Sequence, residues 1–230
     1  MLLMEKSLDG FSLLEVALGL TVIGVLAAGA LKGYGLLKQA RLYKTVQQIQ
    51  GARIACMMFK ERFGFLPGDA PEEILLEAMQ SGVGQLRGGN GDGLIDGNPL
   101  TPWSEASLFW CHLKTAGFLK DIRFSQKQEG IFVPQTASGS GLFVMSNPPG
   151  IGYGNWFVIA SMAGADKAIL TPEAAQGLDK KFSNGNPLEG TMQSRDAPGS
   201  EQQSCVKEGR YNLDTQRPCC LVYVAIDNGA

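Results

Sequence analysis

The chain has 230 residues, of which 44% are hydrophobic and 18% charged, and its formal net charge is -2 at pH 7. Such a balance provides no basic field that attracts nucleic acid, so no specific nucleic-acid partner is inferred. If roughly the first sixty residues form one helix, about 170 remain, which is enough for a single domain with its own core.

The first element is an apolar run over residues 11–31, in which Glu15 is the only charged side chain before Lys32. As a helix this run would be about 31 Å long, enough to cross a bilayer. A carboxylate within a membrane costs about 2.5–3.5 kcal/mol on insertion scales, so Glu15 is expected to have a partner. The alternative interpretation is a secretory signal cut near residues 27–30, but Asp9-Gly10 precedes the apolar run instead of following it.

The second half of this helix is predicted to be amphipathic. Beyond Lys32, apolar residues recur at three- and four-residue spacing with basic and amide residues between them. We expect one helix over residues 11–62, loosened near Gly33 and Gly35, because each glycine costs up to about 1 kcal/mol relative to alanine. Gly64 and the turn Pro67-Gly68 end it. A small domain cannot bury the first half, so lipid or other subunits must cover it.

The rest of the chain predicts short helices and strands. Three helices are expected, two of them capped by a threonine followed by a proline at Thr101 and Thr171. The helices lie at residues 71–81, 102–119 and 172–182, and the strands at 131–134, 142–146, 156–161 and 221–226. A long polar stretch covers residues 183–217. The fold class is α+β: the long N-terminal helix packs on a C-terminal antiparallel sheet with short extra helices.

Five cysteines are present, and none forms a C-x-x-C pair that would indicate zinc or thioredoxin-like chemistry. Cys205 and the pair Cys219-Cys220 enclose a polar loop. A disulfide there would stabilise the fold by about 3 kcal/mol and indicate an oxidising compartment. Cys219 and Cys220 lie on opposite faces of the last strand, so only one easily reaches Cys205. The alternative is that all five cysteines are reduced and buried.

The glycine-rich segment 88–97 is a candidate metal site. Oxygens of Asn90, Asp92, Leu94 and Asp96 have the alternating spacing of a calcium loop, with Gly93 at the turn, which makes Ca²⁺ a candidate ligand. The first position of such a loop and its final glutamate are missing. The competing interpretation is a Gly/Asn/Asp turn without metal.

The sequence contains no set of catalytic residues. The single histidine, His112, adjoins Cys111 on a predicted helix, and neighbours on a helix do not face each other, so both are interpreted as packing or surface residues. No Ser-His-Asp set, phosphate loop or paired-carboxylate cleft stands out. We therefore expect that the chain is not an enzyme.

Residues 10–15 read Gly-Phe-Ser-Leu-Leu-Glu and lead directly into the apolar run. This N-terminus resembles that of type IV pilins and their pseudopilin relatives, and a weaker similarity to prepilin-type proteins covers most of the chain. The resemblance implies a leader peptide at 1–10, a helix at 11–62 whose residues 11–31 span the membrane and form the filament core, and a globular head at 63–230.

The same resemblance implies how the chain is processed and assembled. A prepilin peptidase would cut between Gly10 and Phe11 and methylate the new amine of Phe11. Glu15 of one subunit would then neutralise this amine on its neighbour, in a head-to-tail contact that generates a helical polymer. The resemblance also favours Cys219 as the partner of Cys205, and calcium binding by some pseudopilins supports the loop at 88–97.

The function implied is that of a structural subunit of a type IV pilus-like filament. Its expected partners are other pilin subunits, the prepilin peptidase, the inner-membrane assembly platform and the membrane itself. The precursor is expected as a single-pass protein of the bacterial inner membrane with its head outside the cytoplasm. The alternatives are a pseudopilin of a type II secretion system, including a minor or tip subunit, and a membrane-anchored extracytoplasmic binding domain or enzyme.

Overall fold

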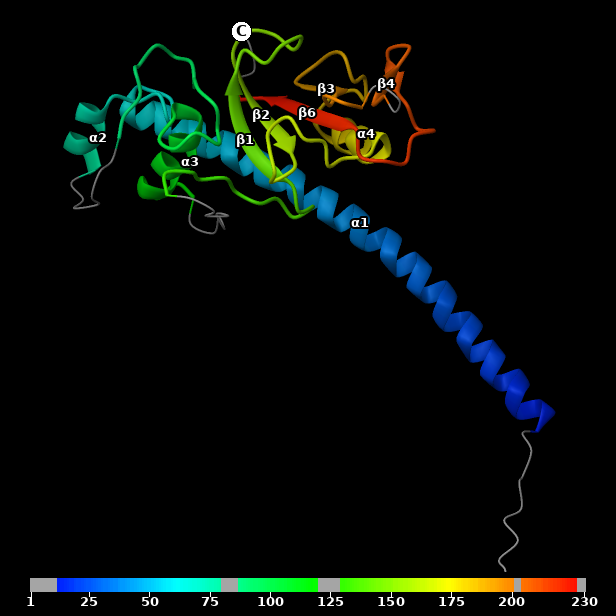
Figure 1. The fold of residues 1–230 in the computed structure, drawn as a ribbon. Coiled ribbons are helices and arrows are strands. Elements are labelled where there is room, and N and C mark those ends of the chain that lie inside the picture. Colours follow the sequence, from blue (N-terminus) through cyan, green and yellow to red (C-terminus); the bar gives the residue numbers. More distant parts are fainter. Residues whose placement is uncertain (1–11, 80–86, 120–128, 201–203, 227–230) are drawn as a thin grey trace, which may run out of the picture. The chain divides into compact units, whose positions relative to one another are not determined.

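The computed structural model describes residues 12–79, 87–119, 129–200 and 204–226, and it has the predicted α+β fold (Figure 1). The chain divides into two units, Met1–Arg41 and Leu42–Ala230. The elements are α1 (Leu13–Phe63), α2 (Glu72–Met79), α3 (Glu105–Thr115), β1 (Gly141–Ser146), β2 (Asn155–Ala160), α4 (Pro172–Phe182), β3 (Met192–Asp196), β4 (Val206–Lys207), β5 (Arg210–Tyr211) and β6 (Cys220–Ala225).

The described part of the first unit consists of helix α1, which begins at Leu13 and passes through Gly33 and Gly35 without a break. Its large apolar side chains are exposed: Leu14 is 70% and Val25 73% accessible. By length and composition α1 can cross a membrane. The predicted long apolar helix is thus present, and the expected loosening at the glycines does not occur.

The second unit contains a four-stranded antiparallel sheet in the order β1-β2-β6-β3, and β4 pairs with β5 in a separate ribbon. Phe157 in β2 is opposite Val144 in β1 and Val224 in β6. Successive side chains of these strands alternate between the two faces of the sheet. The strands predicted at 142–146, 156–161 and 221–226 are confirmed to within one residue.

The two faces of the sheet pack against different parts of the chain. One face joins α1, α3 and α4 in a single hydrophobic core that includes Ile49, Phe109 and Leu178. The opposite face packs against segments without regular structure, and its cluster includes Trp156 and Tyr223. The prediction that the helices lie on one side of the sheet is confirmed.

Two predicted features of the strands are wrong. Residues 131–134 do not form a strand, and only isolated bridges occur at Pro134 and Gln135. Ile131 and Val133 are buried against the sheet, which accounts for their apolar character. Conversely, β3 is a strand that was not predicted, because it lies within the polar stretch at residues 183–217. It is a strand because its backbone pairs with β6, and its Met192 is fully buried.

Of the two predicted threonine N-caps, the one at Thr171 is confirmed and the one at Thr101 is wrong. α4 begins as expected, with Thr171 as N-cap accepting a hydrogen bond from the amide of Ala174, followed by Pro172. The expected start of α3 at Thr101 is wrong, because Ser104 is its cap and accepts from the amide of Ser107.

Candidate functional site

Glu15 lies in the first turn of α1, where a carboxylate interacts favourably with the helix dipole. Its side chain is exposed, as are those of Leu14 and Leu18 beside it. The next acidic residue along the chain is Glu61. The predicted processing residues Gly10 and Phe11 lie outside the described residues. Glu15 is therefore a single carboxylate in an otherwise apolar and exposed segment.

The second half of α1 has a different environment. Thr45, Ile49, Ala52, Cys56 and Phe59 are all at most 1% accessible and recur at a spacing of three or four residues. This stripe faces the core of the second unit. Helix α1 thus combines a first half whose apolar side chains are exposed and a second half that is buried in the core of the head.

The candidate calcium loop is held together by its own hydrogen bonds. Oδ1 of Asn90 accepts from the amide of Asp92 (2.9 Å), and Oδ1 of Asp92 accepts from the amide of Leu94 (2.8 Å). The two carboxylate oxygens of Glu105 accept from the amides of Asn90 and Asp96, each at 2.9 Å. These interactions fold the loop against the start of α3.

Asp69 and Asn155 hold the same loop from the other side. Oδ2 of Asp69 accepts from the amide of Gly93 (3.0 Å), and Asn155 accepts from Ile95 and donates to the Gly93 carbonyl. Burial raises the pKa values of Asp69 and Glu105, and the charge of Asp92 raises both further. Oδ1 of Asp69 is buried and has no hydrogen-bond partner among the residues that the structure describes.

The carboxylates in and around this loop make hydrogen bonds within the protein. The carboxylates of Asp69, Asp92 and Glu105 accept hydrogen bonds from backbone amides, and Oδ1 of Asp96 accepts one from the hydroxyl of Ser146 (2.5 Å). Within the described parts of the chain no three His, Cys, Asp or Glu residues are grouped to hold a metal. The structure shows Asn90, Asp92 and Asp96 in a hydrogen-bonded turn, and Ca²⁺ at Asn90, Asp92, Leu94 and Asp96 stays a prediction.

His112 is buried, as one of its two predicted roles requires. Its Nδ1 accepts from the amide of Gly68 (2.9 Å), so Nε2 carries the proton and donates to the carbonyl of Arg87 (2.9 Å). The ring also stacks on Phe59 at a centroid distance of 6.1 Å. Desolvation lowers the pKa of His112 to about 4. The imidazole is thus a neutral residue that connects α3 to two loops.

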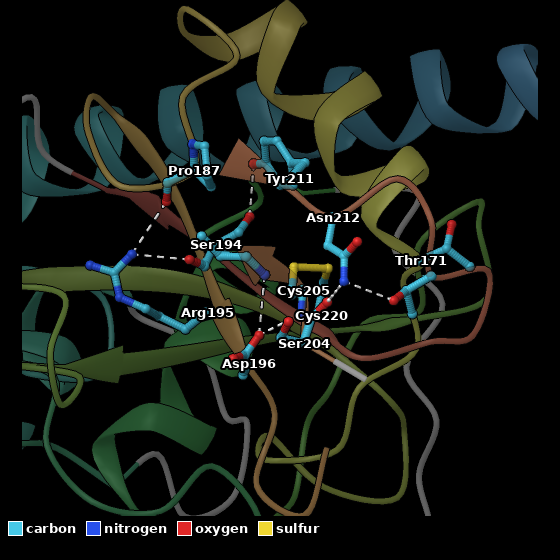
Figure 2. The surroundings of a disulfide bond; sticks show 12 residues. Thr171, Pro187, Ser194, Arg195, Asp196, Ser204, Cys205, Tyr211, Asn212 and Cys220 are labelled. Carbon is cyan, nitrogen blue, oxygen red and sulfur yellow. Dashed lines mark hydrogen bonds between the residues drawn. A yellow bond between two sulfur atoms is a disulfide. The ribbon is translucent and has the colours of Figure 1, made fainter. Parts of the chain in front are cut away.

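The disulfide joins Cys205 to Cys220, and Cys219 is a buried free thiol (Figure 2). The prediction that Cys219 is the partner is therefore wrong. The pairing follows from the register of the sheet: Asp196 in β3 is opposite Cys220, and its Oδ1 accepts from the amide of Cys205.

A buried polar network that the sequence did not indicate joins α4, β3 and β5. The hydroxyl of Tyr211 donates to Oδ2 of Asp179 (3.0 Å) and also lies 2.9 Å from the hydroxyl of Ser194. Burial raises the pKa values of Asp179 and Tyr211. In the sequence Asp179 stands between Leu178 and Lys180, where an exposed carboxylate is the ordinary expectation.

Compared with protein-family models, curated proteins and solved structures, the chain has no match in any of the three.

Proposed function

We propose that this chain is a structural subunit of a type IV pilus-like filament, cut by a prepilin peptidase and assembled through its N-terminal helix. The observation that carries the proposal is the contrast within α1: its first half exposes apolar side chains, and its second half is buried by the head. Glu15 is the only charged residue of the exposed apolar half before Lys32.

The exposed half of α1 requires a different environment from water. Monomeric soluble proteins rarely expose contiguous apolar patches larger than a few hundred Å². A helix satisfies all its backbone hydrogen bonds internally, so it can exchange lipid for other apolar helices without exposing polar backbone. A subunit stored in the membrane and then packed among copies of the same helix meets both requirements.

Glu15 gives such a polymer a defined register. Once a peptidase cuts after Gly10, Phe11 carries a free amine four residues before Glu15. In a bundle of apolar helices the attraction between an amine and a carboxylate is stronger than in water, and either charge alone is unfavourable. An intermolecular pair therefore favours one axial offset between neighbouring subunits.

The test is the mass of the processed protein. The full chain is coexpressed with a prepilin peptidase, extracted from membranes in detergent and measured by intact-mass spectrometry. The expected product lacks residues 1–10 and carries one added methyl group at Phe11. The control is Gly10→Val, whose bulk should block cleavage. If the chain keeps its leader and this variant behaves identically, the chain is a permanently anchored protein of another class.

A further inference from the structure

Cys220 begins β6 and Cys219 directly precedes it, so the folding chain has two adjacent thiols that could pair with Cys205. Cys219 and Cys220 are both buried, and both belong to the same hydrophobic core as Cys205. The Cα atoms of Cys205 and Cys220 are 5.0 Å apart. Because consecutive Cα atoms lie about 3.8 Å apart, a shift of one residue would bring Cys219 into the position of Cys220.

Asp196 holds the register in which Cys220 is chosen. It is the residue of β3 opposite Cys220, so its backbone position is set by the sheet. Its Oδ1 accepts hydrogen bonds from the amides of Cys205 and Val206, the second at 3.3 Å. Figure 2 shows this carboxylate beside the disulfide. One side chain thus attaches the segment that carries Cys205 to the strand next to Cys220.

The backbone of Cys219 is fixed by hydrogen bonds. Its carbonyl accepts from the amide of Ala197 (2.9 Å), and the carbonyl of Leu170 accepts from the amides of both Cys219 and Cys220 (3.1 Å each). Burial, and then the negative charge of Asp196, raise the pKa of the Cys219 thiol. Since the thiolate is the attacking species in disulfide exchange, a raised pKa lowers the share of Cys219 that can attack the neighbouring bond.

We propose that Asp196 is a positioning residue that selects Cys220 over Cys219 as the disulfide partner of Cys205. Formation of the bond removes two protons and two electrons from the thiols of Cys205 and Cys220, and a disulfide oxidant such as oxidised glutathione takes up the electrons. The competing step is exchange: the Cys219 thiolate attacks the sulfur of Cys205, and Cys220 leaves as a thiolate that then takes a proton. Exchange needs no oxidant.

The test locates the free thiols after refolding. The full chain in detergent is reduced, reoxidised with a glutathione redox buffer and quenched with acid. Free thiols are alkylated with one reagent, the disulfides are reduced and alkylated with a second, and fragmentation mass spectrometry places both labels. In the unaltered chain the first label is expected on Cys219 and the second on Cys205 and Cys220.

Asp196→Ala should raise the fraction with Cys220 free by about tenfold, because hydrogen bonds to a charged acceptor contribute enough to change an equilibrium by that factor. Asp196→Asn keeps an acceptor oxygen and should give an intermediate fraction. The control is Asp214→Ala, an exposed residue of the same loop, which should keep the normal pattern. An unchanged distribution in Asp196→Ala, or an equal change in the control, overturns the proposal.

A second measurement covers the case in which Asp196→Ala fails to fold. In Cys220→Ser, Cys205 can pair only with Cys219 within the loop, and Asp196 should make this oxidation about tenfold slower than that of the unaltered chain. Adding Asp196→Asn should restore part of the rate. Equal rates with and without Asp196 would contradict the selection. Neither experiment depends on filament assembly.

Discussion

The hydroxyl of Tyr211 donates a hydrogen bond of 3.0 Å to Oδ2 of Asp179, a carboxylate with no solvent exposure. Oδ1 of the same carboxylate has no side-chain or backbone donor among the hydrogen bonds of the described residues. Burial raises the pKa of Asp179, although the Tyr211 hydroxyl opposes the shift. The interaction is thus specific in geometry, and the charged form of Asp179 still destabilises the head.

The sign of the resulting pH dependence follows from this shift. A carboxyl with a raised pKa in the folded state stabilises the fold most below its unfolded pKa, near 3.9, and this contribution is lost as pH rises through the folded pKa. Asp179→Asn does not titrate. As pH rises from 4 to 8, the melting temperature of Asp179→Asn should therefore rise relative to that of the unaltered chain. The difference should be about 2–4 °C for each kcal/mol of unfolding free energy that the unaltered chain loses.

Thermal unfolding followed by near-ultraviolet circular dichroism measures this difference. Asp214→Asn, which changes an exposed carboxylate, should show no such gain. Tyr211→Phe should lower stability by about 1–3 kcal/mol, because it removes the hydroxyl that donates to Oδ2 of the buried Asp179 carboxyl. If the melting temperatures of Asp179→Asn and the unaltered chain differ by the same amount at every pH, the raised pKa of Asp179 is contradicted.

His112 predicts the opposite pH dependence. Its pKa falls to about 4 in the folded state, whereas the unfolded side chain titrates near 6.5. Between these values the unfolded chain binds a proton that the folded chain does not, so stability falls with falling pH by about 1.4 kcal/mol per unit. His112→Gln should remove this slope. The unaltered chain has one histidine, so its single imidazole NMR signal should stay unprotonated at pH 5; titration of that signal near 6.5 would overturn the prediction.

Glu105 should stabilise the loop at 88–97 without any cation. Glu105→Ala removes the acceptor for two backbone amides, which should cost about 2–3 kcal/mol in urea unfolding, whereas Glu61→Ala on the exposed side of α1 should have little effect. The melting temperature should be the same in calcium and in a chelator. A rise with calcium that Asp92→Ala or Asp69→Asn abolishes would instead establish a metal site.

The distribution of basic residues and the disulfide predict opposite orientations of the head in the membrane, so the orientation can be tested. Lys32, Lys38, Arg41 and Lys44 follow the apolar run, and Lys6 alone precedes it. The positive-inside rule by itself would place the head in the cytoplasm. A disulfide such as Cys205–Cys220 forms in oxidising compartments, so we expect the head outside. A phosphatase reporter that is active only outside the cytoplasm should be active when fused after residue 230, and inactive when fused after the leader.

Most of the fold could be predicted because local patterns and the final packing agree. The apolar residues of β1, β2 and β6 and the threonine cap of α4 have the same role in the structure as in the sequence. β3 could not be predicted in this way, since its residues Gln193 and Arg195 are polar and pairing with β6 alone makes it a strand. Its existence depends on a partner about thirty residues away in the chain, which no local pattern reports.

The candidate sites also combine features that local sequence predicts with features that depend on distant residues. Cys205 and the cysteine pair were correctly interpreted as ends of a disulfide loop, but the choice of Cys220 depends on the strand register that places Asp196 opposite it. In the loop at 88–97 the oxygens have part of the spacing of a calcium loop. The backbone amides of this loop donate to Asp69 and Glu105, which lie outside the motif and could not be assigned to it from spacing.

Glu15 provides the decisive test of assembly. Glu15→Gln preserves the size of the side chain and removes its charge, so insertion and cleavage should proceed while the proposed intermolecular pair with the Phe11 amine cannot form. Because either charge alone is unfavourable among apolar helices, incorporation into filaments should fall at least about tenfold. Immunoblotting of sheared filaments, set against the cleaved chain that remains in membranes, measures this ratio.

Two controls separate register from general damage to the helix. Thr21→Val, on the same exposed segment, removes a hydroxyl that bonds only within α1 and should assemble normally. A Glu15→Gln subunit mixed with unaltered chains should still offer its own Phe11 amine to a neighbour, so it should enter filaments better than when it is the sole subunit. Normal assembly of Glu15→Gln alone would show that burial of apolar surface is sufficient and that Glu15 sets no register.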